Sequence, residues 1–520
     1  PYTTLFRSKR MEENTKSLIK QQAWESAPKM HISCLLYAIF YTFCLYQNRS
    51  GITFPFYVGG TLFFFGFYLK KSGVTAVKDN RFWTVALILL GVINCTTDSY
   101  VLIGLNRLLG IVLFAVWMLQ MLLGQKTQKW RMGTWCREIW RVFWGSLCKI
   151  SAPFTEAIAY RKAQNPEPND EQKIQKRNRV ILAVVIGIAV SIPILCIVGV
   201  LLLCADAVFY QMFCDMFDWV LQWHIPEWLS NGEVFRVLLM VVICFVYTYG
   251  MLAFCRKRQS QEEAVQESRP QWDAYVAITA AVLITALYVL FCGVQIFGLF
   301  LGKMSLPKGY TYEEYARSGF FPLLFVCIFN MCLVPACHAF FARSRVLNLL
   351  LTIICGCTYI MIASSAYRMI LYINCYGMTF LRLAVLWTLA VMVMLTAGMI
   401  YDIHHEDFML FRYLLIVVTL GYLGFAMLHP DYWVARYNIA TIEQGGAADA
   451  YYLQTRLSAD AAPAIAAMDN VEIEETGYRL ENLQREYFKR IQEENEQMHI
   501  RNWNLSRAAA GYYAKKALVN

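Results

Sequence analysis

The sequence predicts an all-α, polytopic helical membrane protein with a small helical module at its C-terminal end. Hydrophobic residues make up 58% of the 520 residues and charged residues only 16%, which is more apolar surface than a soluble core of this size buries. Apolar stretches of about 18 or more residues, each long enough to cross a hydrocarbon layer of roughly 30 Å, recur through most of the chain. After residue 428 the chain becomes Ala-rich and polar and keeps a helical pattern.

We expect about eleven spans, because the chain carries that many separate apolar stretches. They are 31–47, 53–69, 82–97, 99–123, 180–204, 234–254, 275–301, 319–341, 345–373, 378–400 and 409–428. The third and fourth meet so closely at Asp98 that they must form a hairpin. Together they define a membrane domain over residues 31–428. Most of the 17 cysteines lie within these spans, where cysteine behaves as a small hydrophobe.

The first residues need a separate interpretation. PYTTLFRS is what translation of a common sequencing-adapter sequence yields. We therefore expect residues 1–10 to contribute nothing to the fold, in the same way as other sequence scars. Residues 11–30, beginning at Met11, form a short polar and basic segment on the cytoplasmic side.

The distribution of basic residues predicts the orientation of the spans. Lysines and arginines gather in 70–81, 124–179 and 256–258, whereas 205–233 has none and carries several acidic residues. Basic loops stay cytoplasmic, so the N-terminus is expected inside and, after eleven spans, the C-terminal module outside. The net charge of +10 then belongs to the inner membrane face, and no nucleic-acid partner is expected.

Two loops and the C-terminal tail have patterns of their own. Residues 130–150 repeat Trp and Arg at helical spacing, which is typical of a helix lying in the headgroup region. The aromatic, acidic loop 205–233 is either an outer lid or a surface helix without a functional part. The tail, 429–520, packs either on the membrane domain or on a partner protein. Five apolar residues form one stripe along it, Leu480, Leu483, Tyr487, Ile491 and Met498.

Three blocks of sequence carry a resemblance to a known family. The pattern R-M-x-L-Y-x-x-x-Y-G-x-T-x-x-R occupies 368–382, YTYEEYARSGFFPLLFVCIFN occupies 310–330, and HPDYWVARYN occupies 429–438. Over roughly residues 80 to 465 the chain resembles bacterial membrane proteins grouped as domain of unknown function 4173 and the related group 4153. The resemblance implies a multi-span protein of the bacterial cell membrane and brings no established activity.

Two arginines interrupt the late spans and are the candidate site. Arg368 lies seven residues before Cys375 and Arg382 seven residues after it. The short segment INCYG between them is expected to be a turn, with Gly377 as the residue that breaks the helix. In a hairpin both guanidinium groups leave the chain at one depth, about 10 Å below the turn. Such charges are costly in a bilayer, so something must compensate them.

Two alternatives explain these arginines. Each can reach lipid phosphate or pair with an acid of the bundle; the acids nearest in the expected topology are Asp98, Glu313 and Glu314. Alternatively, both clamp the anionic group of a lipid or solute, since planar guanidinium donors suit phosphate and carboxylate. In that case Tyr372 and Tyr376 line the site as interfacial aromatics.

Other polar residues of the spans point to packing rather than chemistry. His338 and Asn330 are eight residues apart in one span and are expected to form interhelical hydrogen bonds; a proton path is the alternative. DIHHED, 402–407, is expected to be a solvated turn, because adjacent histidines rarely converge on one metal. Nucleotide-binding, serine-hydrolase and zincin motifs are absent from the sequence. We therefore expect no metal and no cofactor.

Three classes of function remain open. The first is a non-catalytic membrane scaffold or sensor that engages protein partners through its tail. The second is a transporter or lipid-handling protein that reads an anion through the arginine pair. The third is an outer-leaflet membrane transferase, for which Asp98, Glu313 and Glu314 are the evident acidic candidates. We favour the first class, without catalysis.

Overall fold

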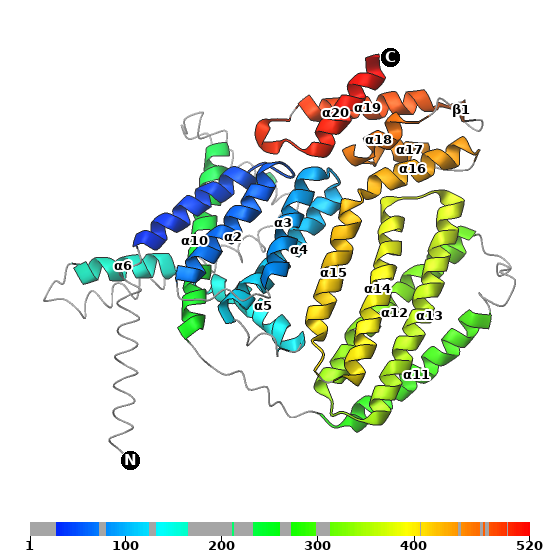
Figure 1. The fold of residues 1–520 in the computed structure, drawn as a ribbon, viewed down its shortest axis with the longest axis horizontal. Coiled ribbons are helices and arrows are strands. Elements are labelled where there is room, and N and C mark those ends of the chain that lie inside the picture. The colour runs from blue at the N-terminus through cyan, green and yellow to red at the C-terminus, as the bar shows by residue number, and fades with distance from the viewer. Residues whose placement is uncertain are drawn as a thin grey trace. The chain divides into compact units, whose positions relative to one another are not determined.

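In the computed structural model the chain is mostly helical (Figure 1). It divides into two compact units. The first unit contains residues 1–47 and 140–262, and the second contains residues 48–139 and 263–520. The residues that the structure describes are 28–71, 80–123, 130, 132–164, 211–212, 232–260, 272–297, 312–405, 407–445, 449–468, 472–473, 478–496 and 498–519.

Eight helices among the described residues are long and apolar enough to cross a membrane. They are Pro28–Leu45, Tyr100–Leu123, Glu233–Arg256, Ala274–Gln295, Phe320–Phe340, Arg345–Tyr376, Phe380–His404 and Leu410–Met427. Large apolar side chains such as Leu283, Leu290 and Phe297 are mostly exposed on their outer faces, where lipid is the solvent that accepts them. The protein is a multi-pass membrane protein.

The expected number of eleven spans is not confirmed. The stretch 82–97 forms helix α3, Arg81–Thr96, which has 16 residues and is shorter than a typical span. The stretch 53–69 forms α2, Thr53–Lys71, a 19-residue helix that ends in two lysines. The stretch 180–204 and most of the loop 205–233 lie outside the described residues.

The first unit is held together by polar contacts beside its apolar packing. It contains the helix Pro28–Leu45, α6, Ala152–Gln164, and α10, Glu233–Ser260. The hydroxyl of Tyr249 donates to Glu156 Oε2 over 2.6 Å, and Arg256 Nη2 donates to the same oxygen over 2.9 Å. Helix α5, Met132–Leu147, falls within the predicted interfacial segment, and its Trp140 and Trp144 are both exposed.

The second unit begins with three packed helices. Helix α2 packs on α3, and α3 turns back into α4, Tyr100–Leu123, through residues 97–99. The predicted hairpin at Asp98 is therefore present. In this group Trp117 Nε1 donates to Thr84 Oγ1 over 2.9 Å, and Tyr422 of α15, Leu410–Met427, donates to Asn106 Oδ1 over 2.8 Å.

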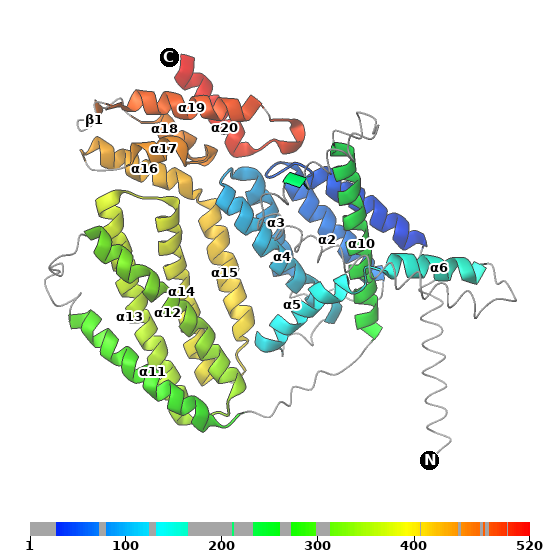
Figure 2. The same cartoon turned by 180° about the vertical axis from the view of Figure 1, so that it is seen from behind.

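Helix α13, Arg345–Tyr376, lies at the centre of the remaining membrane helices. Its neighbours are α11, Ala274–Gln295, α12, Tyr312–Phe340, and α14, Phe380–His404; α15, Leu410–Met427, packs on α14 (Figure 2). Gly377 ends α13 with a φ of +74°, a conformation that favours glycine. Thr379 then caps α14 by accepting from the Arg382 amide.

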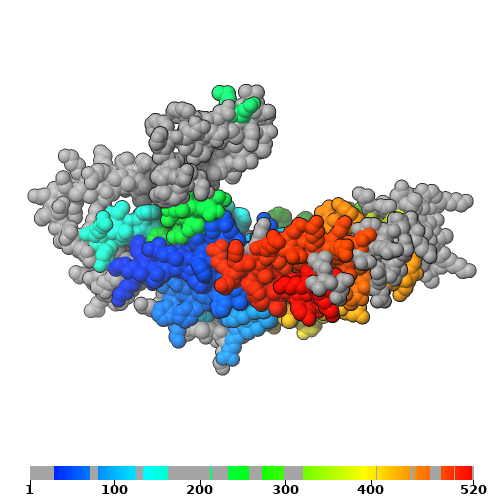
Figure 3. Space-filling model, turned by 90° about the horizontal axis from the view of Figure 1, so that it is seen from above, coloured from blue at the N-terminus to red at the C-terminus, as the bar shows by residue number. Residues whose placement is uncertain are grey.

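The C-terminal module consists of short helices with their own apolar core. Its surface is the orange and red area in Figure 3. Its helices are α16, Pro430–Glu443, α17, Ala450–Thr455, η4, Ala459–Ala461, α18, Ala462–Ala466, α19, Leu480–Glu496, η5, Ile500–Asn502, and α20, Leu505–Val519. Leu483, Tyr487 and Ile491 of the predicted stripe are buried there. The helical fold class is confirmed; the described residues of the module also contain one antiparallel pair of two-residue strands, β1, Glu472–Ile473, and β2, Tyr478–Arg479.

Candidate functional site

The first predicted arginine lies inside the membrane bundle. Arg368 is on α13 and only 7% of its surface is exposed. Its Nη2 donates to Gln295 Oε1 of α11 over 3.4 Å. The same amide oxygen accepts from Ser364 Oγ over 2.9 Å. Arg368 therefore reaches toward α11, and Gln295, which the sequence analysis did not single out, is part of its surroundings.

The second arginine closes the end of the helix before it. Arg382, in the first turn of α14, donates through Nη1 to the carbonyl oxygens of Tyr376 at 2.9 Å and Gly377 at 2.5 Å. Its guanidinium carbon is 4.1 Å from the centre of the Tyr372 ring, a cation–π distance. A cation at a helix C-terminus also interacts favourably with the helix dipole. Arg382 is thus a C-terminal cap of α13.

Both arginines lie on one side of α13: Arg368 belongs to that helix, and Arg382 of α14 contacts it through Tyr372. Tyr372, beneath the Arg382 guanidinium, is one helical turn from Arg368, and residues four apart lie on one side of a helix. The Tyr372 and Tyr376 rings are 5.3 Å apart. The structure therefore places both predicted tyrosines beside Arg382. That both arginines hold one anion stays a prediction.

The three predicted acidic partners have different positions. Asp98 has another partner: its Oδ1 accepts from Arg507 Nε over 2.6 Å. Glu313 and Glu314 belong to the first turn of α12, and their side chains lie outside the described residues. Asp98 therefore pairs with the C-terminal module through Arg507.

Asp460 is the centre of a buried polar cluster between the module and the membrane helices. Its Oδ2 accepts from Thr97 Oγ1 over 2.5 Å, and its Oδ1 accepts from the Asp98 amide over 2.9 Å. Ser506 Oγ donates to Oδ1 over 2.5 Å, and His429 Nδ1 lies 3.4 Å from Oδ2. We call the carboxylates of Asp98, Asp431 and Asp460, together with the groups that hydrogen-bond or ion-pair with them, the carboxylate joint.

Asp98 and the α20 end of the module form the second part of the joint. Besides the Arg507 contact, Asn504 Nδ2 donates to the Thr97 carbonyl over 2.8 Å. Asn504 Oδ1 then accepts from the Ser506 amide over 2.9 Å. The loop between α3 and α4 is therefore bonded to residues more than 400 positions later in the chain.

Asp431 and His429 form the third part, at the point where the chain leaves α15. His429 has a φ of +48°, the left-handed region that costs a side-chain-bearing residue some strain. Asp431, in the first turn of α16, accepts from Ser458 Oγ over 2.5 Å. The Tyr487 hydroxyl of α19 donates to the Ser458 carbonyl over 2.7 Å. These bonds fix the exit of the chain from the membrane helix.

The joint shifts the pKa values of its groups in one direction. Burial raises the pKa of Asp98 to about 6, and it outweighs the opposite effect of Arg507. Burial likewise raises the pKa of Asp431 to about 6, against the hydrogen bonds from Ser458. The contact with Asp460 raises the pKa of His429. All three groups therefore hold a proton more tightly in the folded joint than in water.

Further contacts bind the module to other loops at the same ends of the helices. Asn438 bonds both the amide and the carbonyl of Met378, each over 2.7 Å. The Tyr452 hydroxyl accepts from the Phe380 amide over 2.9 Å, and the Ile52 amide donates to the Trp503 carbonyl over 2.8 Å. The turns at residues 48–53, 97–99 and 377–379 thus lie on the side where the chain enters the module, as the alternation of spans predicts.

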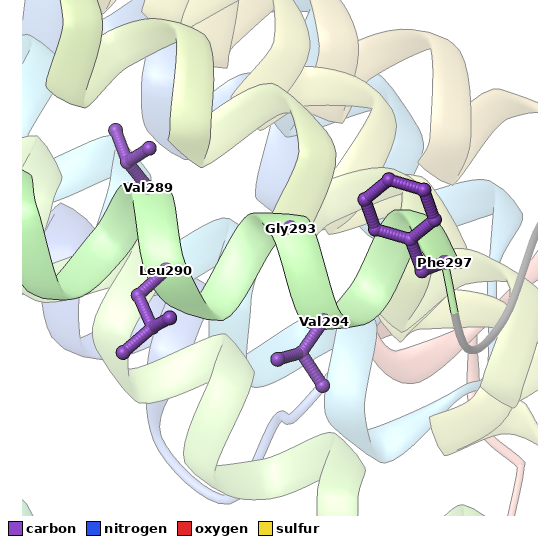
Figure 4. Close-up of a pocket in the computed structure, with 5 residues that line it drawn as sticks. All are labelled: Val289, Leu290, Gly293, Val294 and Phe297. Atoms are coloured by element: carbon purple, nitrogen blue, oxygen red, sulfur yellow. The ribbon is translucent and has the colours of Figure 1, made fainter.

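An apolar hollow on α11 offers no comparable chemistry. The described residues that line it are Val289, Leu290, Gly293, Val294 and Phe297, which follow one another along a single helical stretch (Figure 4). Their side chains are aliphatic or aromatic and largely exposed, as expected for a surface that faces lipid. Over the described parts of the chain, no group of three or more His, Cys, Asp or Glu residues could hold a metal ion.

Comparison with known proteins identifies the family. Residues 84–468 match the model of the family described as Domain of unknown function (DUF4153). The chain belongs to this family. The part of the resemblance that concerned group 4153 is thus confirmed, whereas group 4173 is not shown. No curated protein and no solved structure matches the chain.

The DUF4153 match contains only part of the joint. Asp98, His429, Asp431 and Asp460 lie within residues 84–468, whereas Arg507 lies beyond them. The block HPDYWVARYN contributed to the family resemblance, but its pattern predicted no role for His429 or Asp431. Asp460 carried no signal at all, because a single aspartate in an Ala-rich tail is typical of a solvated surface.

Proposed function

We propose that this DUF4153 protein is a non-catalytic membrane scaffold or sensor whose C-terminal module is coupled to the membrane helices through the carboxylate joint. The observation that carries the proposal is Asp460, which bonds the 97–99 loop, the module and the α15–α16 junction with one buried carboxylate. Both Asp460 oxygens are occupied by donors from the chain. Such saturation supports a mechanical role, because a general base must lie within hydrogen-bond reach of a substrate proton and these oxygens already accept from the chain.

The joint gives a route by which an event on the module reaches the membrane. Packed elements that share buried hydrogen bonds move together rather than deform continuously. A partner that binds the module's outer surface would therefore act on the α3–α4 hairpin through Asp98 and on α15 through His429. We expect the partner to be a protein, which the module engages through exposed aromatics such as Tyr451 and Tyr512.

Site-specific photo-crosslinking in cells tests this function. A photoreactive residue at Tyr451 or Tyr512 should give a discrete crosslinked product with the intact protein. The product should be lost in Asp460→Asn, which disturbs the joint, and kept in Asp407→Asn, an exposed aspartate of the α14–α15 turn. Crosslinks that are absent at both positions, or are unchanged in Asp460→Asn, would contradict the proposal.

The orientation belongs to the same proposal. The excess of basic residues in alternate loops supports a cytoplasmic N-terminus and an extracytoplasmic module. An impermeant thiol reagent should label engineered cysteines at module positions in intact cells and should not label those in 124–129 or 165–179. Labelling of the basic loops instead would reverse the topology and move the proposed partner to the cytoplasm.

A second function is supported by the position of Arg382. Its half-buried guanidinium lies over Tyr372 at the end of α13, the same helix that carries Arg368. Planar guanidinium groups suit phosphate or carboxylate, so an anionic lipid headgroup or an anionic solute would be the ligand of a transporter or lipid-handling protein. Arg382→Lys keeps the positive charge but loses the planar guanidinium that can donate two parallel hydrogen bonds. Phosphate or phosphatidylglycerol should therefore bind at least several-fold more weakly. Arg412→Lys is the control, and equal binding by both variants would remove this candidate.

A further inference from the structure

The membrane bundle formed by α11 to α14 contains a ladder of polar side chains that the functions above do not use. Along α13 these side chains occur at Asn348, Thr352, Thr358, Ser364 and Arg368. The 20 residues from the first to the last span about 30 Å at 1.5 Å per residue, which is the thickness of a bilayer's hydrocarbon core. The neighbouring helices supply a polar partner at each level, so the ladder crosses the bundle in three layers.

The first layer contains the ionisable pair of the bundle. His338 of α12 and Asp402 of α14 approach to 2.7 Å between Nδ1 and Oδ2, and their side chains are only 10% and 15% exposed. Asn348 Nδ2 donates to the carbonyl of Ile403, the residue after Asp402, over 3.2 Å. His404 lies against Thr352 at 3.2 Å. The interhelical hydrogen bonding predicted for His338 is confirmed, and its partner is Asp402 of α14.

The second and third layers continue along the same helix. Asn330 Oδ1 accepts from the Tyr288 hydroxyl over 2.8 Å, and its Nδ2 donates to Thr358 Oγ1 over 3.0 Å. Six residues further along α13, about 9 Å at the helical rise, Ser364 and Arg368 bond Gln295. Between these layers Cys292 Sγ lies 3.6 Å from the Cys357 carbonyl.

Several buried atoms of the ladder have no hydrogen-bond partner among the described residues. They are His338 Nε2, Asn348 Oδ1, Thr285 Oγ1 and Ser365 Oγ. Thr285 is one turn of α11 from Tyr288, and Ser365 is next to Ser364. A buried polar atom without a partner costs about 1 to 3 kcal/mol, and hydrocarbon offers it nothing. Side chains that only join helices would be expected to satisfy one another.

We propose that this ladder is a hydrated proton path through the α11–α14 bundle, with the His338–Asp402 pair as its proton-exchanging group. The proton is favoured over larger solutes because the ladder is closely packed: Asn330, Thr358, Ser364 and Ser365 are all at most 1% exposed. A gap of about 9 Å between layers has the length of a chain of two or three hydrogen-bonded waters with spacings near 2.8 Å. Ionisable residues within membrane helices commonly mark such relays.

The geometry assigns the atom that carries the proton. A carboxylate only accepts hydrogen bonds, so His338 Nδ1 carries the hydrogen that faces Asp402, and Nε2 holds the lone pair. A proton from water binds Nε2 and gives an imidazolium that Asp402 neutralises. It then leaves from Nε2 to the next water of the ladder, which restores the neutral ring. No other bond changes.

The other charged and titratable groups along the path shape its direction. Asp402 and His404 belong to the His338 end, Tyr288 and Cys292 to the middle, and Arg368 to the opposite end. The fixed positive charge of Arg368 disfavours a cation there. We therefore expect slow conduction, with protons taken up more readily from the side at which His338 lies.

Proton flux into vesicles tests the path. The full chain is reconstituted into liposomes with a pH-sensitive dye inside, and a pH gradient is imposed with valinomycin and potassium to balance charge. The wild-type protein should dissipate the gradient faster than protein-free vesicles. Asp402→Asn and His338→Gln should each lower the protein-dependent rate at least tenfold, and Asn330→Leu should lower it by interrupting the middle layer.

Matched controls separate loss of the path from loss of the fold. His405→Gln removes an exposed histidine of the same turn, and Thr388→Val removes a hydroxyl of α14 that bonds only its own helix; both should conduct like the wild type. Gel filtration and helical circular dichroism establish that each variant is folded, and Asp402→Asn is isosteric. Wild-type flux equal to that of protein-free vesicles, or folded Asp402→Asn and Asn330→Leu variants that conduct like the wild type, would overturn the proposal.

Discussion

The carboxylate joint and the polar ladder both bury polar groups, but they differ in charge and in how completely their hydrogen bonds are satisfied. The joint concentrates charge: three aspartates, a histidine and Arg507 lie together, and each Asp460 oxygen has at least two contacts. The ladder is mostly neutral, its pairs are spread along about 30 Å of helix, and several of its atoms have no partner among the described residues. A satisfied network fixes one arrangement, whereas a partly satisfied one favours water or a moving proton.

The difference follows from what surrounds each region. The joint lies where the helices end, so a hydroxyl and an arginine from the module reach the carboxylates there. Inside the bundle, helical backbone groups already bond one another, so only side chains can serve the ladder. The joint is therefore expected to respond to mutation as a stability element, and the ladder as a path that can be interrupted without unfolding.

The largest effect is expected from removing the central carboxylate. Asp460→Ala leaves the donors of Thr97, Ser506 and His429 without their acceptor, which should lower the free energy of unfolding by about 3 to 5 kcal/mol. Thermal unfolding in detergent and protease cleavage of the module measure it. Asp407→Ala, in an exposed turn, should change neither. A module that stays protease-resistant in Asp460→Ala would show that the joint does not hold it.

The second effect concerns Arg507, which pairs with Asp98 at 2.6 Å. Arg507→Met leaves a buried carboxylate without its cation and should cost about 3 kcal/mol. Asp98→Asn in the same chain should recover much of the loss, because no charge is then left unpaired. A double-mutant cycle measures this coupling. Additive losses in the two single variants would mean that the pair contributes little to the joint.

The third effect is a dependence of module docking on pH. The pKa of Asp98 and of Asp431 is raised from 3.8 to about 6, so the folded joint binds protons more tightly than the unfolded chain and is stabilised as the pH falls. The raised pKa of His429 acts in the same direction, since its contribution is present below pH 6.5 and is lost as the pH rises through the folded value.

The expected change lies between neutral and mildly acidic pH. For one carboxyl with these pKa values, docking should be about 0.8 kcal/mol more stable at pH 5.5 than at pH 7.5. The thermal midpoint of the module should therefore rise on acidification. Asp98→Asn combined with Asp431→Asn should flatten the dependence. A midpoint that falls on acidification in the wild type, but not in this variant, would show that the sign is wrong.

The sequence predicted the helices well and the joint poorly. Apolar length and the Asp98 hairpin were legible because periodicity and turn chemistry are local. The Gly377 turn between Arg368 and Arg382 was predicted for the same reason. The partners were not: Asp98 bonds Arg507 across 409 positions, and His338 meets Asp402 across 64. Such pairings depend on how helices stack in three dimensions, and one sequence carries no record of that stacking.

The smallest effect tests how closely the module approaches the membrane helices away from the joint. A Cβ at Gly51, in the turn before α2, would lie 2.8 Å from both the Arg501 carbonyl oxygen and the Asn502 Cα. Both are backbone atoms, so neither can move as a flexible side chain would. The adjacent Ile52 amide also bonds the Trp503 carbonyl over 2.8 Å, which holds the two segments together.

Gly51→Ala should therefore force the 500–503 segment away and cost about 1 to 2 kcal/mol. Gly104→Ala is the matched control: it lies within α4, a Cβ there meets nothing within 4 Å, and alanine is the better helix former. The difference between the two thermal midpoints isolates the contact from the general effect of replacing glycine. If Gly51→Ala and Gly104→Ala unfold alike, the close approach at Gly51 contributes nothing measurable to the docking of the module.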